Sequence, residues 1–287
     1  MTTIGVDIGG THLRVAAGRP DDSPRIVRAS TPRSYPELIS TVTDMAQELC
    51  HDPPSAVGVG LPGAVSDQRA LFIPALPFLD DRAIGAALQS RFNVTVRLAN
   101  DAQCALLAEH RVGAAAGCSS AIMIVIGTGV GGAMLVNGRL YRGAHGTAGA
   151  FGWLPGASAD PRHGAFERDA SGQGLDMLAA TLGVSAADMF GEAEAGRQRF
   201  VDAAASYGYT LGRGLAAIVS ICDPELVIVG GVVAPHVTFL TPSIRQAIRD
   251  CASPTVQEVP IVSARLGVDA GVIGALCLAQ GEMDCRP

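Results

Sequence analysis

Two glycine-rich turns contain the residue types that bind phosphate through the polypeptide backbone. The first reads Asp7-Ile8-Gly9-Gly10-Thr11: the glycines present backbone N–H groups, Thr11 adds a hydroxyl, and Asp7 could face a metal-bound phosphate. The second, Gly127-Thr128-Gly129-Val130-Gly131-Gly132, is a turn of the same kind. Either turn alone could be an ordinary hairpin. Two of them, each near the front of one half of the chain, favour a pair of phosphate-binding hairpins.

An asparagine–aspartate pair, Asn100-Asp101, stands where an expected strand ends and an expected helix begins. This end of a strand is the usual position of functional residues in α/β folds. Asp101 could accept a proton from a hydroxyl that attacks phosphorus, and Asn100 could bind a neighbouring hydroxyl. The alternative is that Asp101 only caps the helix.

A glycine pair, Gly230-Gly231, follows the apolar segment Glu225–Val229, which we expect to be a buried strand. Glycine lets a flat adenine ring approach the backbone closely. Glycine also simply ends many strands, so this pair has two interpretations.

The 21 basic residues of this 287-residue chain are all arginine, against 27 acidic residues and a net charge of −6. The absence of lysine excludes a Walker A loop, a protein-kinase phosphate-anchoring lysine and a pyridoxal phosphate Schiff base. Any phosphate must therefore be bound by backbone N–H groups, a metal ion or arginine. The acidic balance, without a basic stripe, argues against nucleic acid as a partner.

The seven cysteines include no CxxC pair, which favours reduced, mostly buried thiols in a cytoplasmic protein. No signal peptide is evident, and the longest apolar stretch, Ala121–Val136, is interrupted by glycines, so we expect no membrane span. Charged residues make up only 17% of the chain, against roughly 25% in typical domains. This low fraction suggests that part of the surface is covered by another subunit.

The elements that must position these residues alternate between strand and helix, and their order is similar in the two halves. We therefore expect two α/β lobes with ligands bound in the cleft between them, one formed by 1–100 with about 269–287 and the other by 101–268. A long irregular loop, Gly143–Ala165, interrupts the second half and is itself a functional signal. The expected strands are Thr3–Asp7, Leu13–Gly18, Ile26–Ser30, Ala56–Leu61, Thr95–Ala99, Ser120–Ile126, Gly131–Val136, Arg139–Tyr141, Glu225–Val229 and Val259–Ser263; the expected helices are Tyr35–Leu49, Arg82–Phe92, 102–113, Gln173–Leu182, Arg197–Ile221, Pro235–Arg249 and Asp269–Ala279.

Seven motifs, in this order and spacing, resemble the ROK family of sugar kinases and related repressors, within the actin-like ATPase superfamily. The resemblance covers essentially the whole chain. The matching stretches are Asp7–Thr11, Gly60–Gly63, Asn100-Asp101, Gly127–Gly132, Gly143–Gly149, Asp223–Gly231 and Asp269–Ala275.

The resemblance implies a two-lobed actin-like (ribonuclease H-like) α/β fold and ATP-dependent phosphorylation of a sugar hydroxyl. Asp101 would be the general base, Mg²⁺ would accompany ATP beside Asp7, and the protein would be a homodimer. The residues expected to bind nucleotide are Asp7, Gly9, Gly10, Thr11, Gly127, Thr128, Gly129, Gly131, Gly230 and Gly231, and those expected to bind sugar are Gly63, Asn100, Trp153 and Glu167.

The chain departs from the family pattern where the sugar should bind. Ala150 and Trp153 replace a glutamate and a histidine of the family's sugar-binding signature, and Ala75 replaces an asparagine, whereas Glu167 matches the remaining sugar-binding glutamate. The loss of these polar contacts should change which acceptor the protein prefers. Trp153 could stack on an apolar sugar face or an acetamido group, or could pack in the core of its loop.

The family's zinc ligands are also replaced, by Trp153 and by residues near Ser158, Asp160 and Ala165, so we expect no structural zinc. Two other functions stay open. The protein could be a catalytically weak sugar sensor that acts through a protein partner, since we expect no DNA-binding segment before Asp7. It could also be a phosphotransferase for a non-sugar acceptor.

Overall fold

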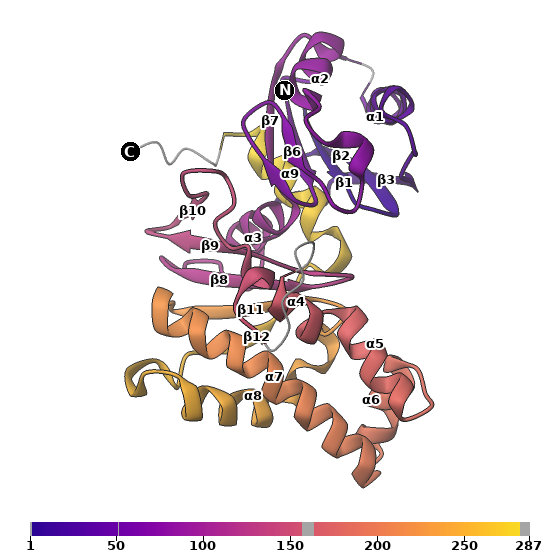
Figure 1. Ribbon diagram of the computed structural model, residues 1–287. Helices are drawn as coiled ribbons and strands as arrows, with labels where there is room; N and C mark the ends of the chain where they lie inside the picture. Colours follow the sequence, from indigo (N-terminus) through magenta and orange to yellow (C-terminus); the bar gives the residue numbers. More distant parts are fainter. Residues whose placement is uncertain (1, 51, 157–163, 282–287) are drawn as a thin grey trace. The chain divides into compact units, whose positions relative to one another are not determined.

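The computed structural model describes residues 2–50, 52–156 and 164–281 (Figure 1). The chain divides into two compact units: residues 1–119, 133–148 and 265–287 form the first, and residues 120–132 and 149–264 form the second. The lobe boundaries expected at residues 100 and 268 stay a prediction. The two compact units are defined by packing, whereas the expected lobes were defined by the order of sequence motifs.

The first unit is built on a five-stranded sheet in the order β3–β2–β1–β4–β7. β2 pairs antiparallel with both β1 and β3, whereas β4 runs parallel to β1 and β7 parallel to β4. The carboxyl ends of β1, β4 and β7 therefore share one edge of the sheet. The bounds of the strands are β1 Thr3–Ile8, β2 His12–Gly18, β3 Arg25–Ser30, β4 Ala56–Leu61 and β7 Thr95–Asn100.

Helices cover both faces of this sheet, as the alternation of side chains requires. Ile4, Val6 and Ile8 of β1 point into a core shared with α1 (Tyr35–Leu49) and α2 (Ile84–Phe92). On the other face, a Cβ at Gly5 would lie 2.6 Å from a carbonyl of α9 (Ala270–Ala279), so that helix lies directly on the backbone of β1. α3 (Asp101–Val112) packs against α9. The short strands β5 (Ala64–Val65) and β6 (Ala70–Phe72) pair with each other.

The second sheet repeats the plan of the first, in the order β10–β9–β8–β11–β12. β10 pairs antiparallel with β9, whereas β11 is parallel to both β8 and β12. The unit boundary falls within β9. The strands are β8 Ala121–Ile126, β9 Val130–Val136, β10 Arg139–Tyr141, β11 Leu226–Gly231 and β12 Ile261–Ser263.

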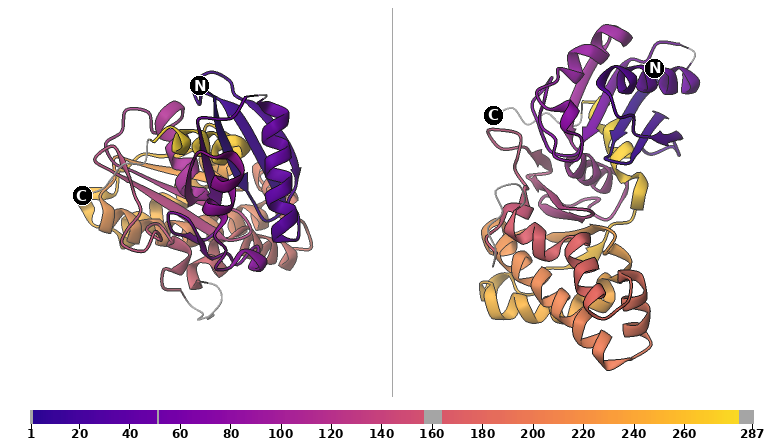
Figure 2. Two further views of the ribbon diagram at one scale, coloured as in Figure 1. Left: turned by 90° about the horizontal axis from the view of Figure 1, so that it is seen from above. Right: turned by 45° about the vertical axis from the view of Figure 1, so that its right-hand side comes forward.

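The second unit also holds five helices within its described residues, and α8 lies alongside α7 (Figure 2). They are α4 Ala165–Ala170, α5 Gly172–Thr181, α6 Ala186–Glu194, α7 Gln198–Cys222 and α8 Val237–Cys251. No helix in the described part of the chain is long and apolar enough to cross a membrane.

The structure corrects several expected boundaries. Gly230 and Gly231 do not follow the strand but are the last residues of β11. The helix expected from Arg82 begins at Ile84. The loop 143–165 contains a 3-10 turn, Phe151–Trp153, and ends where α4 starts. α6 was not expected; its signal was the N-cap Ser185, whose hydroxyl accepts from the Asp188 N–H.

Candidate functional site

The first glycine turn lies between β1 and β2, and the residue that follows β3 donates hydrogen bonds to its carbonyl groups. Gly9 closes the turn by donating its N–H to the His12 carbonyl at 2.9 Å. The Thr31 hydroxyl donates to the Gly9 carbonyl at 2.7 Å, and the Thr31 N–H donates to the Thr11 carbonyl at 3.0 Å. Within the described residues, no protein acceptor meets the N–H groups of Gly10 and Thr11. These two groups are therefore available to an anion.

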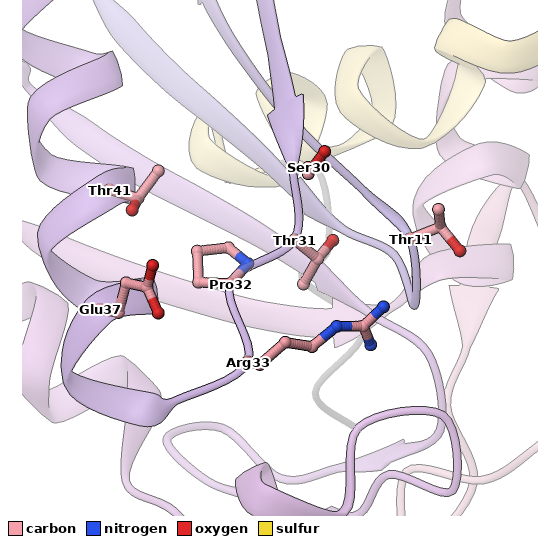
Figure 3. Close-up of a pocket in the computed structure, with 7 residues that line it drawn as sticks. All are labelled: Thr11, Ser30, Thr31, Pro32, Arg33, Glu37 and Thr41. Atoms are coloured by element: carbon pink, nitrogen blue, oxygen red, sulfur yellow. The ribbon is translucent and has the colours of Figure 1, made fainter.

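A cavity of about 450 Å³ lies beside this turn (Figure 3). Arg33 extends across it and donates to the Gly10 carbonyl at 3.4 Å, which places a guanidinium group at the hairpin. Sequence reasoning missed Arg33, although a cation soon after β3 in a chain without lysine was a signal. The cavity is lined by Thr11, Ser30, Thr31, Pro32, Arg33, Glu37 and Thr41.

Asp7 is a buried carboxylate near the end of β1, just before the first turn, with a relative exposure of 7%. Burial raises the pKa of Asp7, and the Arg14 guanidinium, which donates to Oδ2 at 3.0 Å, opposes that shift. Charges of alternating sign continue outward, because Arg14 lies 4.0 Å from Asp269 and Asp269 is paired with Arg28 at 2.7 Å. Arg14 therefore favours the ionised form of Asp7, although burial is the larger effect and the pKa of this carboxyl group stays raised.

The Asn100-Asp101 pair lies at the junction of β7 and α3, as expected. Asn100 is the N-cap of α3: its side-chain oxygen accepts from the Ala102 N–H, and Gln103 completes a capping box. Its amide nitrogen donates to the Gly63 carbonyl at 2.9 Å. Asn100 therefore holds the Gly63 turn, in which a φ of +128° favours glycine. A contact between Asn100 and sugar stays a prediction.

Asp101 is the first residue of α3, and one of its oxygens accepts from the Ala102 N–H at 2.8 Å. Burial raises the pKa of Asp101 to about 7, and the negative charge of Asp7 adds to the shift. Asp7, Gly60 and Ala99 lie in register across β1, β4 and β7, which places both carboxylates at the same edge of the sheet. A carboxyl group with a pKa near 7 is suited to accept a proton at neutral pH.

The second glycine turn, between β8 and β9, is fixed differently. The Gly127 N–H donates to the Gly129 carbonyl at 2.9 Å, and the Val130 N–H donates to Glu167 Oε2 at 2.8 Å. In the described part of the chain, the N–H groups of Thr128 and Gly129 meet no protein acceptor. Glu167, expected to bind sugar, thus contacts the residue that follows the second glycine turn. Gly131 lies just beyond it, in β9.

The remaining predicted residues of the second unit differ in accessibility. Gly230 is buried in β11, where a Cβ would lie 3.0 Å from the Met123 methyl group, whereas Gly231 is exposed with a φ of +80°. Trp153 is 56% exposed, so packing in a loop core does not describe it. Ala150 is also exposed.

The predicted lack of a zinc site stays a prediction. The described residues contain no group of three His, Cys, Asp or Glu side chains able to hold a metal. Ser158 and Asp160 lie outside the described residues.

The structure therefore distributes the predicted residues over the two units. The first unit contains Asp7, Gly9, Gly10, Thr11, Gly63, Asn100 and Asp101; the second contains Gly127, Thr128, Gly129, Gly131, Trp153, Glu167, Gly230 and Gly231.

Comparison with known proteins defines the class: residues 3–282 match the ROK family, and the chain belongs to that family. The N-acetylgalactosamine kinase AgaK of Shewanella sp. (strain ANA-3) is 30% identical, over 96% of each chain. The N-acetylmannosamine kinase of Citrobacter koseri is 29% identical, over 98% of this chain and all of its own.

The fold is likewise that of a solved member of the family. The ROK family glucokinase from Streptomyces griseus, in complex with glucose and AMPPNP, superimposes with a TM-score of 0.83 at 26% identity, covering 98% of this chain and 100% of that one. The predicted family, α/β actin-like fold and sugar-kinase class are thereby confirmed.

Proposed function

We propose that the protein is an ATP-dependent kinase that phosphorylates a hydroxyl of a hexose or hexose derivative, with Asp101 as the general base. The observation that carries this proposal is the position of Asp101. It begins α3 at the edge of the sheet that also carries Asp7 and the first hairpin, and its pKa of about 7 suits proton transfer at neutral pH.

The proposed reaction needs a single proton transfer within the first unit. The Asp101 carboxylate accepts the proton of the sugar hydroxyl as the hydroxyl oxygen forms a bond to the γ-phosphorus of ATP. The bond from that phosphorus to the bridging oxygen breaks, and ADP leaves with the electron pair. Asn100 takes no proton; it fixes the start of α3, and with it the Asp101 backbone, through the capping box.

The nucleotide phosphates would bind to N–H groups of the two hairpins, with Thr11 and Arg33 adding a hydroxyl and a cation on the first. Gly230 and Gly231 would border adenosine. Asp7 fits Mg²⁺, because it is a buried carboxylate whose ionised form is favoured by the Arg14 guanidinium, and Mg²⁺ prefers such oxygen ligands through its water shell. When bound with ATP, the ion would neutralise phosphate charge.

The acceptor that we propose to test first is an N-acetylated amino sugar. AgaK and the Citrobacter enzyme are named as kinases of N-acetylhexosamines. Replacing polar groups by Ala75, Ala150 and the exposed Trp153 removes hydrogen bonds to hydroxyls and adds an aromatic surface on which an acetamido group could stack. Glu167 and Gly63 would complete the sugar contacts.

The test is ADP release with a panel of glucose, N-acetylglucosamine, N-acetylgalactosamine, N-acetylmannosamine and glycerol, with D101N as the inactive control. Turnover with at least one sugar, lost in D101N, supports the proposal. Sugar binding without any turnover would identify a sensor instead. Turnover with glycerol alone would identify a non-sugar acceptor.

The proposal extends to assembly and location. A homodimer is consistent with a charged fraction of only 17%, and light scattering on a sizing column would measure its mass. A reducing, cytoplasmic location is consistent with the absence of a CxxC pair among the seven cysteines.

A further inference from the structure

One short segment at the junction of α4 and α5 holds both sides of the second hairpin. Glu167 Oε2 accepts from the Val130 N–H at 2.8 Å, and the Gly172 N–H donates to the Gly127 carbonyl at 2.8 Å. The two hydrogen bonds run in opposite directions: Glu167 accepts from the hairpin, whereas Gly172 donates to it. The junction 167–172 therefore fixes the direction of two peptide units, one on each side of the turn.

Glycines allow this close approach. A Cβ at Gly129 would collide with Glu167 Oε2, and a Cβ at Gly172 would lie 2.7 Å from the Gly127 carbonyl oxygen. A Cβ at Gly152 would lie 2.7 Å from the Val130 carbonyl oxygen and 3.1 Å from Glu167 Cβ. The carboxylate is thus packed against bare backbone on two sides. It holds its position by packing as well as by its hydrogen bond.

The contact also determines which N–H groups a phosphate can reach. Glu167 accepts a hydrogen bond from the Val130 N–H, and the Gly129 carbonyl within the turn accepts one from the Gly127 N–H. Among the described residues, the N–H groups at the tip, those of Thr128 and Gly129, have no protein acceptor. Losing the Glu167 contact would leave a buried residue, Val130, with an unpaired N–H and would let the turn re-orient.

We propose that Glu167 is a positioning residue for the phosphate-binding hairpin, so that nucleotide affinity depends on Glu167 before any sugar binds. The inference rests on the proposed function and extends it. A carboxylate offers about four lone-pair sites, so the bond to Val130 is compatible with a sugar hydroxyl on the same group. If sugar strengthens this arrangement, nucleotide must raise sugar affinity by the same factor, because coupling between sites is reciprocal.

The experiment measures AMPPNP·Mg²⁺ binding by calorimetry in the absence of sugar, for wild type, E167A, E167Q and R168Q. E167Q keeps one oxygen that can accept from the Val130 N–H, loses the charge and replaces the other oxygen by an NH₂ group. Arg168 is an exposed neighbour on the same helix and serves as the matched control. We expect E167A to bind roughly tenfold more weakly. E167Q should stay within about threefold of wild type, and R168Q should be unchanged.

Amide hydrogen exchange of unliganded protein gives a second readout that needs neither nucleotide nor turnover. The Val130 amide should exchange faster in E167A and keep its protection in E167Q. If E167A does not fold, E167D replaces it in both measurements.

Unchanged AMPPNP affinity and unchanged Val130 exchange in E167A would overturn the inference and leave Glu167 as a sugar ligand only. Equal losses in E167Q and E167A would overturn it as well, because the acceptor oxygen would then not matter. Failure of the proposed function has a different signature: wild-type protein would release no ADP with the sugar panel, whatever the hairpin amides show.

Discussion

The two glycine hairpins share a sequence pattern and a position in their sheets, yet different side-chain chemistry stabilises them. Donors hold the first: the Thr31 hydroxyl and the Arg33 guanidinium bind its carbonyl groups. An acceptor, Glu167, holds an N–H group of the second. The first hairpin also adjoins a buried charge network, Asp7 with Arg14. From this difference we infer that the proposed chemistry is concentrated at the first hairpin, whereas the second contributes geometry.

Removing the proposed general base, Asp101, should have the largest effect on activity. In D101N, kcat should fall by about 10²- to 10⁴-fold, because an amide accepts no proton. AMPPNP affinity, measured by calorimetry, should change little. The unfolding temperature should rise, since burial disfavours the Asp101 carboxylate and asparagine carries no charge. Near-normal turnover in D101N would contradict the assignment.

The pH dependence follows from the same residue. Because burial and Asp7 raise the pKa of Asp101 to about 7, the base is protonated below that pH and ionised above it. We expect kcat/KM to fall about tenfold per pH unit below 7 and to level off above it. E167Q should show the same profile, since Glu167 belongs to the other hairpin. A profile flat from pH 5 to 8 would contradict the shifted pKa.

Alanine at one glycine in the tip of each hairpin should have different effects on the two hairpins. A Cβ at Gly129 would collide with the Glu167 carboxylate, whereas a Cβ at Gly10 would meet only the Ala75 Cβ at 3.4 Å, an ordinary contact. AMPPNP affinity should therefore fall roughly tenfold or more in G129A and about twofold or less in G10A. Equal losses in both variants would show that the hairpins depend on glycine in the same way.

Much of the fold follows from local sequence. The hairpins, the β7–α3 junction and the similar order of elements in the two halves depend on neighbouring residues, and the structure has them. The helix α6 was missed, although Ser185 is an N-cap residue whose hydroxyl accepts from the Asp188 N–H.

The contacts that hold the hairpins were not predictable from one sequence. Thr31 is 22 residues from Gly9, and Glu167 is 37 residues from Val130, so only the folded chain brings them together. Asn100 shows the same limit. Its type and position suggested a ligand, but whether its amide turns to solvent or to the Gly63 carbonyl depends on the path of a distant turn.

The smallest expected effect comes from removing a side-chain hydrogen-bond donor of the first hairpin. T31V removes the hydroxyl that donates to the Gly9 carbonyl while keeping the shape of the side chain, and Thr31 is buried. T43V is the matched control, because Thr43 donates to the Ile39 carbonyl within α1, away from the hairpin. Each loss should lower the free energy of unfolding by about 1 kcal/mol. Only T31V should also weaken AMPPNP binding, by roughly threefold, because only there does the lost donor orient a peptide unit of the hairpin. Equal nucleotide affinity in the two variants would mean that the first hairpin keeps its shape without the Thr31 hydroxyl.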